Sequence, residues 1–236
     1  TVGDKEYPSV SKIIDIIGGD KTNALVGWAK KVSVEMMAKA LTAKIGTDQK
    51  IDKEFIDWLS VEAKKTPEKL KDEAADIGSQ VHNAIDSWIA TGNIPTMEEK
   101  AKQGFDNFLA WAKHNEIEFV SGDVAVASVK YGYGGRPDAI AKQGSKYVLF
   151  DWKTSNSIRD TYAIQTALYH QAIIETFSIK CSKAFVVRFG KDVVEMEERE
   201  VDIKKSWKAG LAALRLFNAF KNEELWKQYL KDKEVK

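Results

Sequence analysis

Hydrophobic side chains recur every three or four positions over the first half of the chain, which is the spacing of one helix face. One run shows the pattern most clearly: Leu25, Trp28, Val32, Met36 and Ala40. Thr66 followed by Pro67 is typical of a helix N-cap and first helical position. Together these signals predict helices over about 9–17, 23–44, 52–64, 67–91 and 97–115.

From residue 118 onward, short runs rich in β-branched and aromatic residues replace the helical spacing, which indicates strands. They predict strands over about 118–129, 131–141, 146–152, 183–189 and 193–201. Helical patterns return over about 161–177 and from 203 to about 230. A helix between two strands is also the connection that a parallel pair requires. The order of elements therefore predicts an α/β fold.

The composition is that of a water-soluble, well-packed protein rather than a membrane or disulfide-rich one. The 236 residues are 44% hydrophobic and 30% charged. No apolar run approaches the roughly 20 residues that cross a bilayer, and no signal peptide is visible. Cys181 is the single cysteine, so no intrachain disulfide can form, and we expect it to be a small buried side chain before a strand. We expect an intracellular location, in a cytoplasm or encoded by a phage or virus, and an organellar targeting segment removed before Thr1 is compatible with the sequence.

The net charge of only +1 means that any binding to nucleic acid must come from local patches and from metal. Residues 21–44 hold five lysines against one glutamate, whereas residues 191–202 hold two basic and six acidic side chains. Lys30, Lys31 and Lys39 are therefore candidates for binding DNA, with Arg159 as a further candidate. The alternative is an ordinary solvated helix face.

Three charged residues stand at the spacing of a metal-dependent phosphodiesterase. Asp151 and Lys153 alternate with aromatic residues along one predicted strand, so their side chains point to the same face. A turn within residues 142–145 would bring the preceding strand back antiparallel and place Asp138 near Asp151. Two converging carboxylates suit Mg²⁺, which completes its octahedral shell with water and phosphate oxygens. Lys153 could then orient water and offset charge on the phosphate. Taken alone, an Asp-x-Lys sequence is more often a solvated edge or an ion pair.

The segments GRPDAI, VLFDWKTS and QTALYHQ resemble motifs of the PD-(D/E)XK nuclease superfamily, in its RecB-like exonuclease branch. The resemblance implies a restriction-endonuclease-like core, a central mixed sheet flanked by helices, with an N-terminal helical elaboration. It also implies Mg²⁺ or Mn²⁺ as cofactor, held by Asp138, Asp151 and the backbone carbonyl of Trp152, with Lys153 assisting catalysis. Gln165 and Tyr169 match the Gln-x-x-x-Tyr motif of the branch, and residues four apart share a helix face.

A second resemblance concerns Gly78 and His82, which match a Gly-x-x-x-His pattern on a helix before the sheet. The resemblance implies that His82 joins the metal ligands, whereas a helical histidine beside Val81 and Ile85 is otherwise more often a core or surface residue. The opening Tyr7–Ser11 segment is similar to that of mitochondrial genome-maintenance and phage-type members. Where relatives often have Glu before the first motif, this chain offers the shorter Asp123. Relatives with an iron–sulfur cluster use four cysteines, so no cluster is expected here.

We expect one nuclease domain over 1–236, with a mainly helical lobe over 1–115 and an α/β catalytic core over 116–236. The expected function is a metal-dependent exonuclease whose partner is DNA, acting on single-stranded or end-processed substrates. An endonuclease of the same fold shares this chemistry, and only the route by which DNA enters separates the two. A non-catalytic nucleic-acid-binding module is the third alternative, although Asp151 and Lys153 are both retained.

Overall fold

The computed structural model describes residues 6–18, 20–190 and 195–221. Its helices are α1 (Val10–Asp15), α2 (Asp20–Thr42), α3 (Lys53–Thr91), α4 (Glu99–His114), α5 (Asp160–Phe177) and α6 (Ile203–Lys221). Its strands are β1 (Glu118–Gly122), β2 (Val126–Ser128), β3 (Tyr133–Gly135), β4 (Ala139–Gln143), β5 (Lys146–Lys153), β6 (Lys183–Phe189) and β7 (Met196–Glu200).

Two compact units make up the chain. The sheet unit contains residues 1–17 and 80–236, and the helical unit contains residues 18–79. The boundary falls within α3, so the expected helical lobe over 1–115 is divided between the units. A single nuclease domain stays a prediction.

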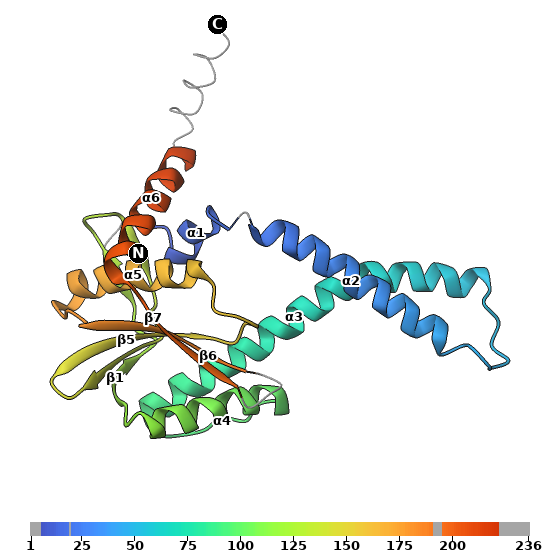
Figure 1. Cartoon of the computed structure of the whole chain (residues 1–236), viewed down its shortest axis with the longest axis horizontal. Coiled ribbons are helices and arrows are strands. Elements are labelled where there is room, and N and C mark those ends of the chain that lie inside the picture. The colour runs from blue at the N-terminus through green and yellow to red at the C-terminus, as the bar shows by residue number, and fades with distance from the viewer. Residues whose placement is uncertain (1–5, 19, 191–194, 222–236) are drawn as a thin grey trace, which may run out of the picture. The chain divides into compact units, whose positions relative to one another are not determined.

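A five-stranded sheet in the order β1-β4-β5-β6-β7 forms the centre of the sheet unit. β5 and β6 are parallel and the other neighbouring pairs are antiparallel, so the sheet is mixed. Figure 1 shows α5 over one face and α4, with the end of α3, over the other. β2 and β3 form a separate two-stranded sheet that contacts α5. The predicted α/β fold, a central mixed sheet flanked by helices, is confirmed.

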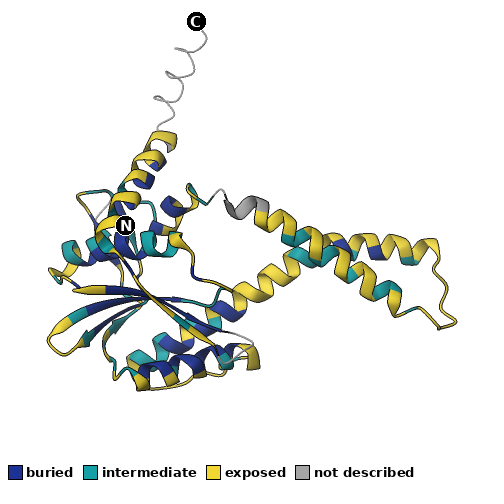
Figure 2. Ribbon diagram, viewed as in Figure 1, coloured by how far each residue is buried: buried dark blue, intermediate teal, exposed yellow. Residues whose placement is uncertain are grey.

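The alternation of side chains along β5 decides what each face of the sheet carries. Phe150 and Trp152 point toward α4, where the Trp152 ring packs edge-on against Phe108 and Trp111 with centroids 5.6 and 5.4 Å apart. Leu149 points the other way and belongs to the core beneath α5. Since side chains alternate, Asp151 and Lys153 share the Leu149 face. Figure 2 shows that the strands at this centre are largely buried.

Two predicted strands are each divided in the structure. The strand over 131–141 is wrong as one element, because β3 ends at Gly135 and β4 begins at Ala139. Pro137 lies between them and cannot donate to a ladder. The strand over 118–129 is likewise divided into β1 and β2, and Asp123 between them has a positive φ of 34°.

The predicted helices over 52–64 and 67–91 are one continuous helix, and the predicted cap at Thr66 is wrong. Pro67 lies inside α3, and the Thr66 hydroxyl donates to the carbonyl of Glu62 at 2.8 Å instead of capping a new helix. The predicted strand over 193–201 begins at Met196, and residues 193 and 194 lie outside the described part. The final helix is described as far as Lys221, and its predicted continuation to 230 lies outside the described residues.

Cys181 is 2% exposed and precedes β6, as expected of a small buried side chain. Burial raises the pKa of its thiol to about 12. Within the described ranges, no helix has both the length and the apolar character needed to cross a bilayer.

Candidate active site

The hairpin of β4 and β5 brings Asp138 and Asp151 together. Gln143 pairs with Lys146 and Ala139 pairs with Phe150, so Asp138 and Asp151 occupy facing positions at the open end of the hairpin. Gly144, in the connecting turn, has a φ of 61°, which glycine adopts without steric cost. The turn at residues 144–145 lies within the predicted range of 142–145, and the two carboxylates lie side by side.

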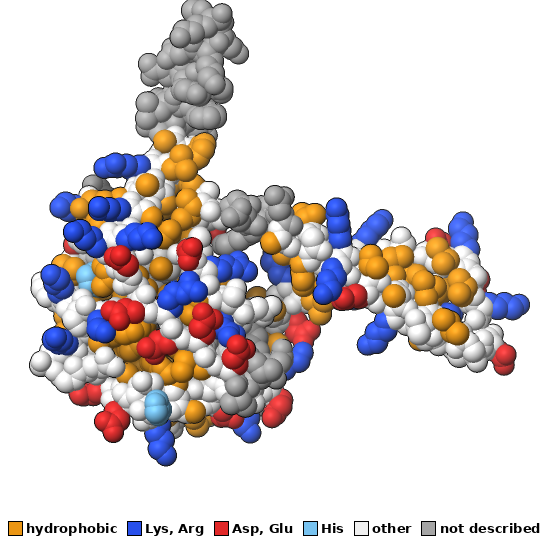
Figure 3. Space-filling model, viewed as in Figure 1, with side chains coloured by type: hydrophobic (Ala, Val, Ile, Leu, Met, Phe, Trp, Pro, Cys, Tyr) orange, Lys and Arg blue, Asp and Glu red, His pale blue; other side chains and the backbone are white. Residues whose placement is uncertain are grey.

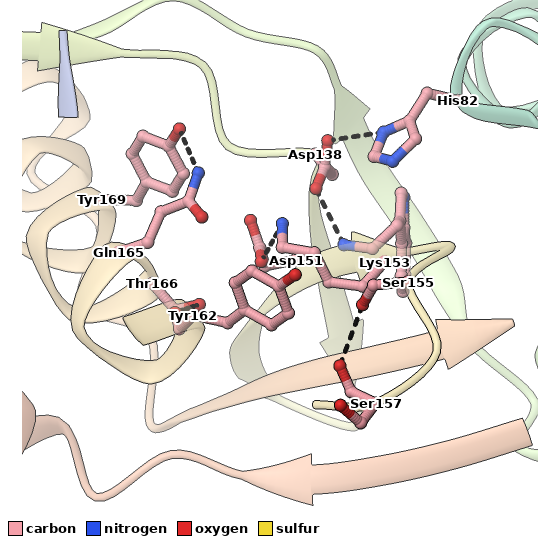
Figure 4. Close-up of polar contacts among 11 residues, drawn as sticks. His82, Asp138, Asp151, Lys153, Ser155, Ser157, Tyr162, Gln165, Thr166 and Tyr169 are labelled. Carbon is pink, nitrogen blue, oxygen red and sulfur yellow. Dashed lines mark hydrogen bonds and ion pairs between the residues drawn. The ribbon is translucent and has the colours of Figure 1, made fainter. Parts of the chain in front are cut away.

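Asp138 is held through both of its carboxylate oxygens. Oδ1 lies 3.1 Å from Nδ1 of His82, and Oδ2 accepts the backbone N–H of Trp152 at 2.7 Å (Figure 4). Burial opposes charge on both side chains, but each stabilises the charged form of the other. The pKa of His82 is therefore raised and the pKa of Asp138 is lowered. Thus His82, on the part of α3 within the sheet unit, lies at the carboxylates.

Asp151 and Lys153 form a buried pair on the same face of β5. The Lys153 ammonium lies 2.5 Å from Oδ2 of Asp151, and the two side chains are 16% (Lys153) and 1% (Asp151) exposed. Burial raises the pKa of Asp151 to about 7 although the Lys153 charge opposes the shift. Burial acts against the charge on Lys153 too, but the carboxylates of Asp151 and Asp138 outweigh it and raise the pKa of the amine.

Helix α5 covers this pair with three side chains from successive turns. The Lys153 ammonium lies 5.0 Å from the centre of the Tyr162 ring. Gln165 donates through Nε2 to the Tyr169 hydroxyl at 3.0 Å, so the predicted shared helix face is present. Burial raises the pKa of Tyr169 to about 12, and the negative charge of Asp151 adds to the effect. Figure 4 shows Tyr162, Gln165 and Tyr169 on the side of the carboxylates away from His82.

A glycine in β3 makes room for Tyr169. A Cβ atom at Gly135 would lie 2.5 Å from Cε1 of the Tyr169 ring, closer than such atoms approach in proteins. Any larger residue at 135 would therefore displace the ring from the site.

The donor set agrees in kind with a hard divalent cation. Carboxylate oxygens are the ligands that Mg²⁺ prefers, and Mn²⁺ also accepts imidazole nitrogen. Oδ2 of Asp151 is buried and, among the described residues, has the Lys153 ammonium beside it but no hydrogen bond of adequate angle. In residues 6–18, 20–190 and 195–221, no three His, Cys, Asp or Glu side chains are grouped so that they alone could hold a metal. An ion here would need water, backbone or phosphate oxygens as further ligands.

Asp86 and Tyr162 also face the site, and the sequence reasoning missed both. Burial raises the pKa of Asp86 to about 6, and the charges of Asp138 and Asp123 add to the effect. The signal was present, because Asp86 follows His82 by four residues and Tyr162 precedes Gln165 by three, so each shares a helix face with a predicted site residue.

The remaining candidates are exposed side chains. Arg159 is exposed immediately before α5. Asp123 pairs with Arg136 at 3.0 Å, and both are more than half exposed. Lys30, Lys31 and Lys39 are exposed on α2 in the helical unit, where Lys31 lies 3.7 Å from Glu35. Figure 3 shows Lys and Arg side chains spaced among apolar ones along this unit.

No protein-family model matches the chain. No curated protein matches it. Among solved structures, the chain is similar to that of SSO0001, at 19% identity over 48% of this chain and 57% of that one, with a TM-score of 0.31. It is also similar to the alkaline exonuclease LHK-Exo from Laribacter hongkongensis, at 13% identity over 69% of this chain and 92% of that one, with a TM-score of 0.37. The complex of LHK-Exo with dAMP gives 14% identity, the same coverage and a TM-score of 0.39. Because these scores are below 0.5, no activity is inferred from them.

Proposed function

We propose that the chain is a Mg²⁺- or Mn²⁺-dependent deoxyribonuclease of the PD-(D/E)XK type that hydrolyses DNA from an end. The observation that carries the proposal is the buried pair of Asp151 and Lys153, with Asp138 facing it across the hairpin. A buried carboxylate is costly unless a cation is beside it. Two carboxylates and one ammonium held together at a strand end can bind a divalent cation and stabilise charge on a phosphodiester.

The cation would be held by Asp138, Asp151 and His82, with the backbone carbonyl of Trp152 as a further ligand. When bound, it would neutralise phosphate charge and make a water molecule more acidic. Asp138 is already fixed by His82 and by the Trp152 N–H, so it need not reorganise to bind. Asp151 would exchange its contact with Lys153 for one with the cation.

Lys153 would then be released to act on the substrate. Its ammonium can donate to a phosphate oxygen, where negative charge develops as water attacks phosphorus and the P–O bond to the leaving sugar oxygen breaks. Tyr162 keeps the ammonium over its ring. Gln165 and Tyr169, which are joined to each other, would shape the space around the phosphate.

Attack at an end, with DNA as substrate, is proposed from the resemblance of residues 7–175 to RecB-like exonucleases. An endonuclease would use the same residues, so topology of the substrate must decide between them. A non-catalytic binding module would have no need of a partly buried lysine paired with a buried aspartate.

The test uses end-labelled linear DNA and closed circular DNA, each single-stranded and duplex, incubated with and without Mn²⁺. The proposal predicts loss of linear DNA, survival of circles, and no cleavage in excess chelator. Cutting of circles would replace exonuclease by endonuclease. No cleavage of any substrate, with Mn²⁺ present and the protein folded, would overturn the nuclease proposal.

A further inference from the structure

A cleft of about 860 Å³ opens next to Tyr169, entirely within the sheet unit. It lies between the start of the chain, the β2–β3 hairpin and α5. Its size is within the roughly 300 to 1,000 Å³ typical of sites for small ligands. Its lining includes Tyr7, Ala125, Val126, Arg136, Tyr169 and Glu175.

The cleft is joined to the candidate active site through Tyr169. The same ring lines the cleft and belongs to the helix face that covers Asp151 and Lys153. Burial raises the pKa of the Tyr169 hydroxyl, and the negative charge of Asp151 adds to the effect. Arg136 lines the cleft two residues before Asp138. Asp138, Asp151 and Lys153 do not line the cleft themselves, so whatever fills it reaches the candidate active site by way of Tyr169 and Arg136.

The charges of the lining favour a neutral group inside the cleft and a phosphate at its inner end. Glu175 is held in place by the Ser128 hydroxyl at 2.8 Å and the Lys130 N–H at 3.2 Å. These bonds keep the pKa of Glu175 low against the effect of burial, so its charge disfavours a phosphate nearby. Arg136 lies two residues before Asp138, and its guanidinium, which is paired with the exposed Asp123 at 3.0 Å, favours a phosphate at that end.

The walls offer aromatic and aliphatic surface suited to a base. The half-buried Tyr7 contributes a ring, whereas Tyr169, 5% exposed, and Val126, 4% exposed, contribute only the small parts of their side chains that reach the cleft. Bases stack on such rings without regard to sequence. We propose that the cleft receives one nucleoside of the DNA strand, the one adjacent to the scissile phosphate. This inference rests on the proposed function and adds the subsite that positions the strand.

The experiment compares parent, Ala125→Trp and Tyr7→Ala, with two matched controls. Ala125 is an exposed lining residue, so a Trp side chain there fills the cleft. Ala110→Trp places the same side chain at an exposed position of α4 away from the lining. Tyr7→Phe keeps the ring that Tyr7→Ala removes.

Two substrates are hydrolysed in Mn²⁺: the p-nitrophenyl ester of thymidine 5′-phosphate and bis(p-nitrophenyl) phosphate, which has neither sugar nor base. The measured quantity is the ratio of their kcat/KM values. Ala125→Trp and Tyr7→Ala should lower this ratio by about tenfold, which is the scale of losing one stacked base. Ala110→Trp and Tyr7→Phe should leave the ratio within about twofold of the parent.

Calorimetric titration of dTMP and of inorganic phosphate gives a second readout that needs no turnover. The subsite is supported if the parent binds dTMP more tightly than phosphate and Ala125→Trp does not. If the parent also hydrolyses neither ester, only the proposed nuclease function is overturned. An unchanged ratio in both cleft variants, or equal binding of dTMP and phosphate, overturns the subsite. A cleft that binds a peptide or an apolar ligand is not expected to bind dTMP. Binding of dTMP therefore excludes those two kinds of occupant.

Discussion

His82 is the residue whose role depends most on its surroundings. On a helix it could equally serve the core, but its Nδ1 lies 3.1 Å from Asp138, and its side chain is 29% exposed. We predict that His82→Ala weakens Mn²⁺ binding while changing thermal stability little, because it removes a ligand rather than core packing. His114→Ala, at an exposed histidine that ends α4, is the matched control. Coinciding Mn²⁺ isotherms for His82→Ala and the parent would remove His82 from the site.

Tyr162 is predicted to position Lys153 rather than to touch the substrate. A cation over a ring is worth about 0.5 to 2 kcal/mol, more when water is excluded. Tyr162→Leu should therefore lower turnover roughly twofold to thirtyfold, whereas Tyr162→Phe, which keeps the ring, should restore it. If Phe and Leu lower turnover equally, the hydroxyl or the packing is responsible and not the ring beneath the ammonium.

Among the helices, α3 contains Pro67 in its interior, and the role of this proline depends on a contact with α2. A proline inside a helix frees the carbonyl four residues earlier, which for Pro67 is that of Ala63. The Ser33 hydroxyl of α2 donates to that carbonyl at 2.7 Å, and both residues belong to the helical unit. The proline therefore leaves open an acceptor that ties α2 to α3.

A double-mutant cycle tests this link. Ser33→Ala should destabilise the helical unit by about 1 kcal/mol, the net value of one hydrogen bond. In a Pro67→Ala background the effect should shrink toward zero, because the alanine N–H introduced there can itself donate to the Ala63 carbonyl. Hydrogen exchange of amides in α2 and α3 reports the unit separately from the sheet. Equal effects of Ser33→Ala in both backgrounds would contradict the link.

The elements that could be predicted from the sequence are those whose local pattern and tertiary surroundings agree. The strand at 146–153 alternates aromatic and charged residues, and both faces of the sheet use that alternation. The parallel pairing of β5 and β6 follows from the helix between them. Pro67 was wrongly interpreted as a helix start, since the Ser33 hydroxyl that binds the carbonyl it frees is distant in sequence. The predicted strand over 131–141 is interrupted at Pro137, which has no N–H to donate to a ladder.

The candidate site shows the same division. Asp138, Asp151 and Lys153 could be predicted because strand alternation and one hairpin place them together. Asp86 and Tyr162 were missed although each shares a helix face with a predicted site residue, because that spacing does not show which further side chains of the face reach the carboxylates. The cleft beside Tyr169 was not predictable either, because it combines segments that begin more than a hundred residues apart.

Across the molecule as a whole, the nearly neutral chain has a local excess of positive charge over residues 21–44, where five lysines stand against one glutamate. We predict that changing Lys30, Lys31 and Lys39 together to Gln flattens the dependence of log affinity on log salt, by roughly 0.7 for each phosphate of single-stranded DNA that is no longer neutralised. Binding is measured with Asp151→Asn as background, in Ca²⁺, over a series of salt concentrations. An unchanged slope would mean that these lysines form a solvated face, and the DNA path would then be sought around Arg159 and α6.

Metal-dependent hydrolysis by the buried pair of Asp151 and Lys153 is best tested with Asp151→Asn. The substitution removes one charge with almost no change of shape, and Asp106→Asn makes the same change at an exposed position of α4. Turnover of end-labelled DNA in Mg²⁺ is measured for both, with folding checked by circular dichroism. We predict that Asp151→Asn abolishes cleavage and that Asp106→Asn retains parental turnover. Lys153→Ala, measured in the same way, should reduce turnover at least about 10²-fold. Turnover of folded Asp151→Asn within about tenfold of the parent would contradict the role proposed for the pair.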